Sequence, residues 1–214
     1  MEDDHPHQPD LPWPLTGADA LREELLAAYA EPSRGHHGVR HLRDVLARLD
    51  ELEATGCTFD RTAVQLAAWF HDAVYDGERD AEERSASWAE SALPSHVDAA
   101  VVAEVARLVR LTEHHRPEVD DANGCALSDA DLSILAAPEA RYAEYVAAVR
   151  AEYAHLSDDV FAEGRARVLR ELSHGDRLFR TEHGAALWES AARANMDAEL
   201  VRLSAEAGRL THGG

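Results

Sequence analysis

A histidine and an aspartate stand side by side at the end of an apolar run. The segment TAVQLAAWFHD leads from helix-favouring and apolar residues directly into His71 and Asp72. Apolar helical runs usually end at a cap or a glycine, whereas imidazole and carboxylate groups bind metal ions. A chain with 13 histidines contains about one such pair by chance. The pair therefore needs support from other segments.

Two histidines precede this pair in the segment RGHHGVRHLRDVL. His37 and His41 are four residues apart, so they share one helical face if the helix has already begun. His41 also borders an apolar stripe that continues through Val45. Histidines exposed at a helix start are the alternative interpretation.

Two more histidines, His114 and His115, end a long apolar segment in LTEHH. Adjacent helical residues point about 100° apart, so at most one of them is expected to share a site with other helices. A cationic C-terminal turn, which the helix dipole favours, is the alternative interpretation.

Two carboxylates, Asp129 and Asp131, lie close together in LSDADLSILAAP, where a short apolar helix is expected to start. One of them could simply cap the helix. A carboxylate here could equally supply an oxygen ligand from a rigid element. Taken together, the order is His, His-Asp, His, Asp, each beside its own apolar run. This donor set suits a divalent Mn, Fe, Co, Ni, Zn or Mg ion.

Helical periodicity dominates the segments that must position these residues. Asp60 is the expected N-cap of one helix, and Pro138 opens another in the first turn, where proline is tolerated. No alternation is long enough for a sheet, and 116–124 looks turn-prone. The sequence predicts an all-α single domain of about eight or nine helices, over 20–30, 39–56, 60–72, 81–93, 96–115, 127–137, 138–156, 157–175 and 186–208.

The predicted domain covers residues 16–207. An acidic, proline-rich tail, 1–15, precedes it, with Trp13 available to dock on the body, and a flexible tail, 208–214, follows. Cys57 and Cys125 are too few and too isolated for a disulfide framework.

The charge balance restricts the partners. The chain carries 21 Lys+Arg against 41 Asp+Glu, a formal charge of −20. Such a surface repels nucleic-acid phosphates and anionic lipids, so neither nucleic acid nor membrane is an expected partner. No segment approaches the roughly 20 apolar residues of a membrane span, and no signal peptide is recognisable. We expect a cytoplasmic protein that binds a small molecule; a monomer and a homodimer both stay open.

The combined segments resemble the HD-domain superfamily of all-helical metal-dependent phosphohydrolases, and more narrowly its small bacterial predicted phosphohydrolase family. The shared segments run from about residue 25 to about residue 200 and lie over most of the chain. They are YAEPSRGHHGVRHL, AAWFHDAVYDGERDAEERSA, LTEHH, LSDADLSILAAP, YAEYVAAVRAEY and FAEGRARVLREL.

This resemblance implies roles for particular residues. The implied metal ligands are His41, His71, Asp72 and Asp129, with Asp131 as the alternative to Asp129. The implied catalytic residues are His115, His37 and Asp72. The implied substrate contacts are Arg34, as a phosphate contact, Glu82 and His114.

The chain departs from the family pattern at two places. Gly35 and His36 stand where relatives often carry a histidine and an aromatic residue, which alters the expected pocket wall. Ala81 stands where two-metal members of the superfamily carry a further histidine, so we expect one divalent ion per chain.

The implied activity is hydrolysis of a phosphoester or phosphoanhydride on a small molecule such as a nucleotide. A metal-activated water would attack phosphorus. Two alternatives are a di-iron oxygenase, which Ala81 disfavours, and a non-catalytic module whose metal only stabilises the fold.

Overall fold

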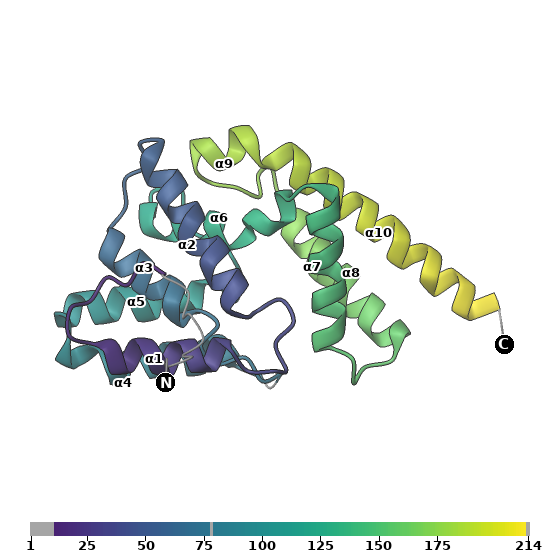
Figure 1. Ribbon diagram of the computed structural model, residues 1–214. Coiled ribbons are helices and arrows are strands. Elements are labelled where there is room, and N and C mark those ends of the chain that lie inside the picture. Colours follow the sequence, from purple (N-terminus) through teal and green to yellow (C-terminus); the bar gives the residue numbers. More distant parts are fainter. Residues whose placement is uncertain (1–10, 78, 213–214) are drawn as a thin grey trace, which may run out of the picture.

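The computed structural model describes residues 11–77 and 79–212 of the chain. Every regular element in these residues is a helix, which confirms the predicted all-α fold (Figure 1). The elements are α1 (Asp19–Tyr29), α2 (Val39–Ala54), α3 (Arg61–Phe70), α4 (Ala81–Ala92), the 3-10 helix η1 (Leu93–Ser95), α5 (Ala99–Leu111), α6 (Ala122–Leu132), the 3-10 helix η2 (Ser133–Ala136), α7 (Glu139–Glu152), α8 (Asp158–Ser173), α9 (Glu182–Leu187) and α10 (Glu189–His212).

Helix α3 lies at the centre of the core. It packs against α2, α5 and α6, and all its residues from Ala63 to Phe70 are buried. The predicted Asp60 cap is confirmed, because its carboxylate accepts a 3.1 Å bond from the Ala63 N–H. A helix that is apolar all round belongs inside the protein. The C-terminal end of α3 therefore lies in the interior, and His71 and Asp72 follow it there.

Helices α7, α8 and α10 form a second group beside this core (Figure 1). The long α10 packs against both α8 and η2. Arg165 of α8 donates to the carboxylate of Glu199 of α10 at 2.8 and 3.2 Å, and both residues are buried. The Tyr142 hydroxyl donates to the same carboxylate at 2.5 Å. This buried pair, together with Tyr142 of α7, joins the three helices.

The start of α6 and the presence of α9 differ from the sequence-based expectation. Helix α6 begins at Ala122, because the Asp121 carboxylate caps it by accepting from the Gly124 N–H at 2.9 Å. The predicted turn over 116–124 is therefore wrong at its end, and Asp129 and Asp131 lie in the last turns of α6 rather than at its start. The short α9, capped by Thr181, was also not expected.

The ends of the described chain also refine the prediction. Trp13 docks on the body as expected, with its ring edge-on to Trp69 at 4.9 Å between centroids, and Leu11 is buried beside it. Residues 1–10 of the predicted tail lie outside the described residues. Helix α10 continues to His212, past the predicted boundary at 207. Within 11–77 and 79–212, no helix has the length and apolar character needed to cross a membrane.

Two carboxylates anchor the segment that joins α8 to α9. Glu189 accepts the N–H groups of Leu178 and Phe179 at 3.0 Å. Asp129 accepts the next two N–H groups along the chain at 2.8–3.0 Å. Four consecutive backbone donors, which no helix satisfies, are thus bound by two acidic side chains.

Glu189→Gln should weaken the fold in a pH-dependent way. Burial raises the pKa of Glu189, but the Phe179 and Leu178 N–H groups and Arg193 outweigh it, so the pKa lies below its usual 4.5. A lowered pKa stabilises the fold above the unfolded-state value and loses this effect as the pH falls through the folded-state value. We expect a loss of about 1 kcal/mol at pH 7, measured by urea unfolding.

The difference between the two proteins should shrink steadily below pH 4.5, where wild-type Glu189 also becomes neutral. A difference that stays constant from pH 7 to pH 3 would contradict this account of the anchor.

Candidate metal centre

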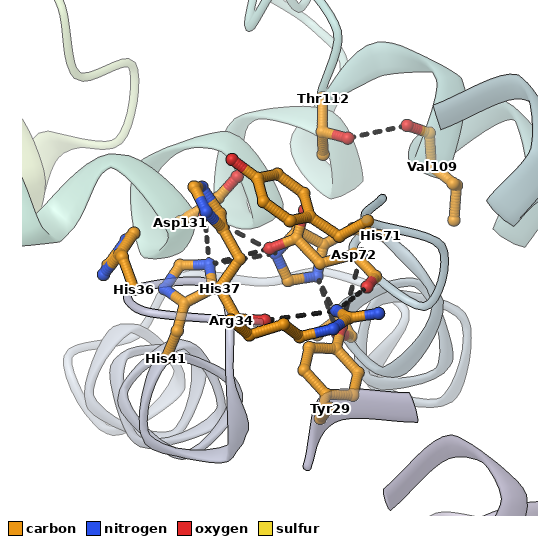
Figure 2. A network of polar contacts seen from close by, with 12 residues as sticks. Tyr29, Arg34, His36, His37, His41, His71, Asp72, Val109, Thr112 and Asp131 are labelled. Carbon is orange, nitrogen blue, oxygen red and sulfur yellow. Dashed lines mark hydrogen bonds and ion pairs between the residues drawn. The ribbon is translucent and has the colours of Figure 1, made fainter. Parts of the chain in front are cut away.

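His71 and Asp72 both face the interior because the helix stops just before them. His71 is the C-cap of α3, and Asp72 follows in a turn. Adjacent residues inside a helix would point about 100° apart. The turn removes this constraint, and Figure 2 shows both side chains beside His37, His41 and Asp131.

Backbone and tyrosine contacts fix the orientation of His71. Its Nδ1 lies 2.8 Å from the carbonyl oxygen of Ala68. A carbonyl only accepts, so Nδ1 carries a proton and Nε2 faces the other side chains. The Tyr29 hydroxyl, buried on α1, lies 3.4 Å from the same Nδ1 and accepts the Asp72 N–H at 3.3 Å.

Arg34 stabilises the turn from below, as Figure 2 shows. Its guanidinium donates to the carbonyl oxygens of Asp72 at 2.5 Å, Ala73 at 3.0 Å and His37 at 3.1 Å. These bonds satisfy carbonyl groups that the end of α3 leaves without helical partners. The Arg34 side chain is only 1% exposed. The prediction that Arg34 contacts a substrate phosphate is therefore wrong, because its donors are committed to the backbone.

Four donor groups meet at one buried point. His41 comes from the first turn of α2, and Asp131 from the last turn of α6. The Nε2 atoms of His41 and His71 are 3.1 Å apart. Asp131 Oδ1 lies 3.0 Å from the first and 3.6 Å from the second. Asp72 Oδ2 lies 3.3 Å and 3.0 Å from the same two nitrogens.

This spacing fits a shared metal ion. Two ligand atoms about 2.1 Å from one ion stand about 3.0 Å apart at a right angle and about 3.4 Å apart in a tetrahedron. Asp72 Oδ2 is also buried without a hydrogen-bond partner in the described part of the chain, and a cation would satisfy it. His41, His71 and Asp131 could thus hold a metal ion, with Asp72 Oδ2 beside them.

The four groups also stabilise each other's charges. Burial lowers the pKa of His41, but the neighbouring carboxylates of Asp131 and Asp72 outweigh burial and raise the pKa to about 9. The pKa of His71 is raised, chiefly by Asp72, against the effect of burial. Burial raises the pKa of both carboxyl groups, but His71 and His41 hold both well below the usual range. The carboxylates are therefore charged at neutral pH, as metal ligands must be.

Asp129 does not join this cluster, so the predicted ligand is replaced by Asp131. Asp129 and Asp131 are two positions apart on α6, so their side chains point about 200° apart around the helix axis. Asp129 therefore points away from His41. Its oxygens accept the N–H groups of Arg180 and Thr181 and the Thr181 hydroxyl at 2.7–3.0 Å. Asp129 is fully buried and anchors the start of α9.

The remaining predicted residues lie around the cluster. His115 Nε2 lies 3.4 Å from Asp131 Oδ2, and its backbone adopts φ +50, an uncommon conformation that turns the ring inward. Burial lowers the pKa of His115. His37 stacks on Tyr75 at 4.1 Å beside His41. His114 is 69% exposed next to Glu113, so of the LTEHH pair only His115 reaches the site.

The cluster opens onto a large cleft between the core and the second helical group. Its volume is about 1620 Å³. His71, Asp72 and Asp131 lie in its lining, and Glu82 and His114 line it as well. The side of α7 and α8 contributes apolar residues such as Val149, Phe161 and Val168.

Sequence reasoning missed two residues that hold the site together. Tyr29 lies on an apolar helical stripe, where it resembles an ordinary core residue. Glu152 lies near the end of a charged helix, where it resembles a solvated carboxylate. Neither carries a local signal. For Asp131 a signal existed, since a cap at Asp121 would have placed it in the last turn of its helix.

Comparison of the chain with family models, curated proteins and solved structures finds no match. The family resemblance noted in the sequence therefore stays a prediction, and the geometry of the site carries the functional argument.

Asp131→Ala should lower the metal affinity, whereas Asp129→Ala should lower the stability of the fold. Asp131→Ala removes a donor, so it should lower the affinity for Mn²⁺ or Zn²⁺ at least about 100-fold while the helices stay folded. Asp129→Ala strips three hydrogen bonds from a buried anchor, so it should cost about 2–4 kcal/mol of stability and leave the affinity of the folded protein unchanged.

Metal titration and urea unfolding of both variants test the assignment. Loss of metal from Asp129→Ala, with Asp131→Ala still binding tightly, would restore the original choice of ligand.

Proposed function

We propose that this protein is a metal-dependent phosphohydrolase that acts on a small phosphorylated compound such as a nucleotide. The observation that carries the proposal is the donor set of His41, His71, Asp72 and Asp131, buried at the base of an open cleft. Imidazole and carboxylate ligands beside open space are typical of hydrolytic rather than purely structural metal sites. The sequence resemblance to HD-domain phosphohydrolases supports the same class.

Particular arginines of the cleft lining could contact an anionic substrate. Acidic residues outnumber basic ones about two to one in this chain, so most surface arginines are expected to form ion pairs with carboxylates. Arg107 and Arg110 in the cleft lining do so. Arg116 and Arg177 also line the cleft, and neither forms an ion pair among the described residues. They are available to bind phosphate.

The size of the cleft supports a substrate larger than inorganic phosphate. Typical small-molecule sites measure about 300–1,000 Å³, and this cleft exceeds that range. Its polar end holds the metal donors, and its apolar wall includes Tyr153, Phe161 and Leu172. A nucleotide, with a charged phosphate and a flat apolar base, matches both ends.

The residues of the site have two proposed roles, binding of the ion and donation of protons or hydrogen bonds to the substrate. His41, His71, Asp131 and Asp72 would hold the ion. When bound, a divalent ion lowers the pKa of a coordinated water and polarises a phosphoryl oxygen. The histidines next to the donor set, His37 and His115, would donate hydrogen bonds to the phosphoryl group or a proton to the leaving oxygen. Water adds to phosphorus, the ester bond breaks, and the alcohol leaves with a proton.

The test is a panel of nucleotides and other phosphorylated metabolites, assayed for phosphate release with Mn²⁺, Co²⁺, Ni²⁺, Zn²⁺, Mg²⁺ and Fe²⁺ in turn. We expect at least one compound to be hydrolysed. Asp131→Ala should lower that turnover at least about 100-fold, because it removes a donor. His96→Ala, which changes an exposed histidine outside the cleft, should leave it unchanged.

Two other results would replace the proposal. Oxygen uptake coupled to an organic substrate would indicate a di-iron oxygenase. No turnover with any metal, together with unfolding when the metal is chelated, would indicate a non-catalytic module that the ion stabilises.

A further inference from the structure

The buried carboxylate of Glu152 binds the loop that precedes α2. Its side chain is 3% exposed. Oxygen Oε1 accepts three consecutive backbone N–H groups, from Gly35, His36 and His37, at 2.8, 2.7 and 2.9 Å. Such a row of N–H groups forms an anion-binding concavity. Here the last residue of α7 fills it.

The second oxygen of Glu152 binds a side chain next to the metal donors. Oε2 lies 2.8 Å from Nδ1 of His37, and the Tyr75 hydroxyl donates to it at 3.3 Å. Tyr75 also stacks on the His37 ring at 4.1 Å. Burial raises the pKa of Glu152, but His37 and the backbone donors outweigh it and lower the pKa. The partner of His37 is therefore an ionised carboxylate at neutral pH.

Gly35 permits the contact between Glu152 and the loop before α2. A Cβ at this position would collide with the carbonyl oxygen of Ala148 on α7. Glycine thus lets α7 approach the loop closely enough for Glu152 to reach all three N–H groups. This close approach explains why glycine stands at position 35, where members of the family that the sequence resembles often carry a larger residue.

His37 is better placed than His115 to exchange a proton with a substrate. Both ring nitrogens of His115 have neighbours, since Nδ1 lies 3.3 Å from Ser128 Oγ and Nε2 lies 3.4 Å from Asp131. His37 uses only Nδ1, and its Nε2 has no hydrogen-bond partner in residues 11–77 and 79–212. His37 lines the cleft, is 23% exposed, and lies 5.8 Å from the His41 ring between centroids.

We propose that Glu152 is a positioning residue that holds His37 with Nε2 toward the substrate, and that His37, carrying a proton on each ring nitrogen, passes the proton on Nε2 to the leaving oxygen. A carboxylate bound to one nitrogen fixes the tautomer and the direction of the other in the same way in other enzymes. As the bond between phosphorus and the leaving oxygen breaks, that oxygen takes the proton and departs as an alcohol. The attacking water returns a proton to His37. This inference rests on the proposed hydrolytic function.

Glu152→Gln separates this role from a structural one. The glutamine carbonyl can still accept the three N–H groups, whereas its amide now faces Nδ1 as a donor and reverses the tautomer of His37. The readout is the leaving group, with p-nitrophenyl phosphate and phenyl phosphate as probes. Nitrophenolate departs without a proton, whereas phenolate needs one.

We expect Glu152→Gln and His37→Gln to lower kcat for phenyl phosphate at least about 100-fold and to change kcat for p-nitrophenyl phosphate less than about 5-fold. Metal content should stay at the wild-type level. Glu144→Gln, an exposed residue on the same helix, is the matched control and should affect neither ester. Equal losses for both esters would overturn proton delivery by His37.

A second readout does not need turnover. In ¹⁵N histidine NMR of the Zn²⁺-loaded protein, at a pH at which the ring is neutral, we expect the single proton of His37 on Nδ1, its transfer to Nε2 in Glu152→Gln, and a shift of Nε2 when inorganic phosphate is added. If His37 is unaffected by phosphate, or identical in both proteins, the inference fails. If the wild type hydrolyses neither ester, the proposed function fails, and the NMR result still decides whether Glu152 directs His37 toward phosphate.

Discussion

Two carboxylates and two imidazoles buried at one point constrain the rest of this structure. Removing a charged group from water costs several kcal/mol, even after relaxation. Asp72 and Asp131 offset this cost only because His41 and His71 lie 3.0–3.6 Å from their oxygens. The protein must therefore bring the ends of three helices, α2, α3 and α6, to one place with little tolerance. A bound divalent cation would balance the same two negative charges with both imidazoles neutral, which is the form that binds a metal ion.

The surrounding contacts serve this convergence. Arg34 takes the carbonyl groups that the turn after α3 leaves unpaired, and Tyr29 covers His71 from α1. On the other side, Glu152 closes the loop that leads into α2. These polar groups lie outside the four candidate metal ligands, yet they determine where those side chains point. The second helical group, fixed internally by Arg165 and Glu199, supplies both Glu152 and the far wall of the cleft.

Much of this arrangement was predictable from local pattern. The all-α class, the cap at Asp60 and the docking of Trp13 followed from periodicity, turn chemistry and residue type. The meeting of His41 with His71 and Asp72 was implied by the resemblance to HD-domain proteins. The choice between Asp129 and Asp131 did not follow from the sequence, because α6 is buried almost all round and so has no polar face to fix its rotation. Arg34 was misjudged for a related reason: sequence does not reveal that backbone carbonyls 38 residues away will occupy a guanidinium.

The account depends most directly on an ion bound between α2, α3 and α6. Anomalous diffraction from crystals of the protein loaded with Mn²⁺ or Zn²⁺ tests it. We expect one strong anomalous peak within about 2.0–2.3 Å of the Nε2 atoms of His41 and His71 and of an Asp131 oxygen, with none at Asp129. No peak at this position in protein saturated with metal, or a peak held by other histidines of the chain, would contradict the central claim.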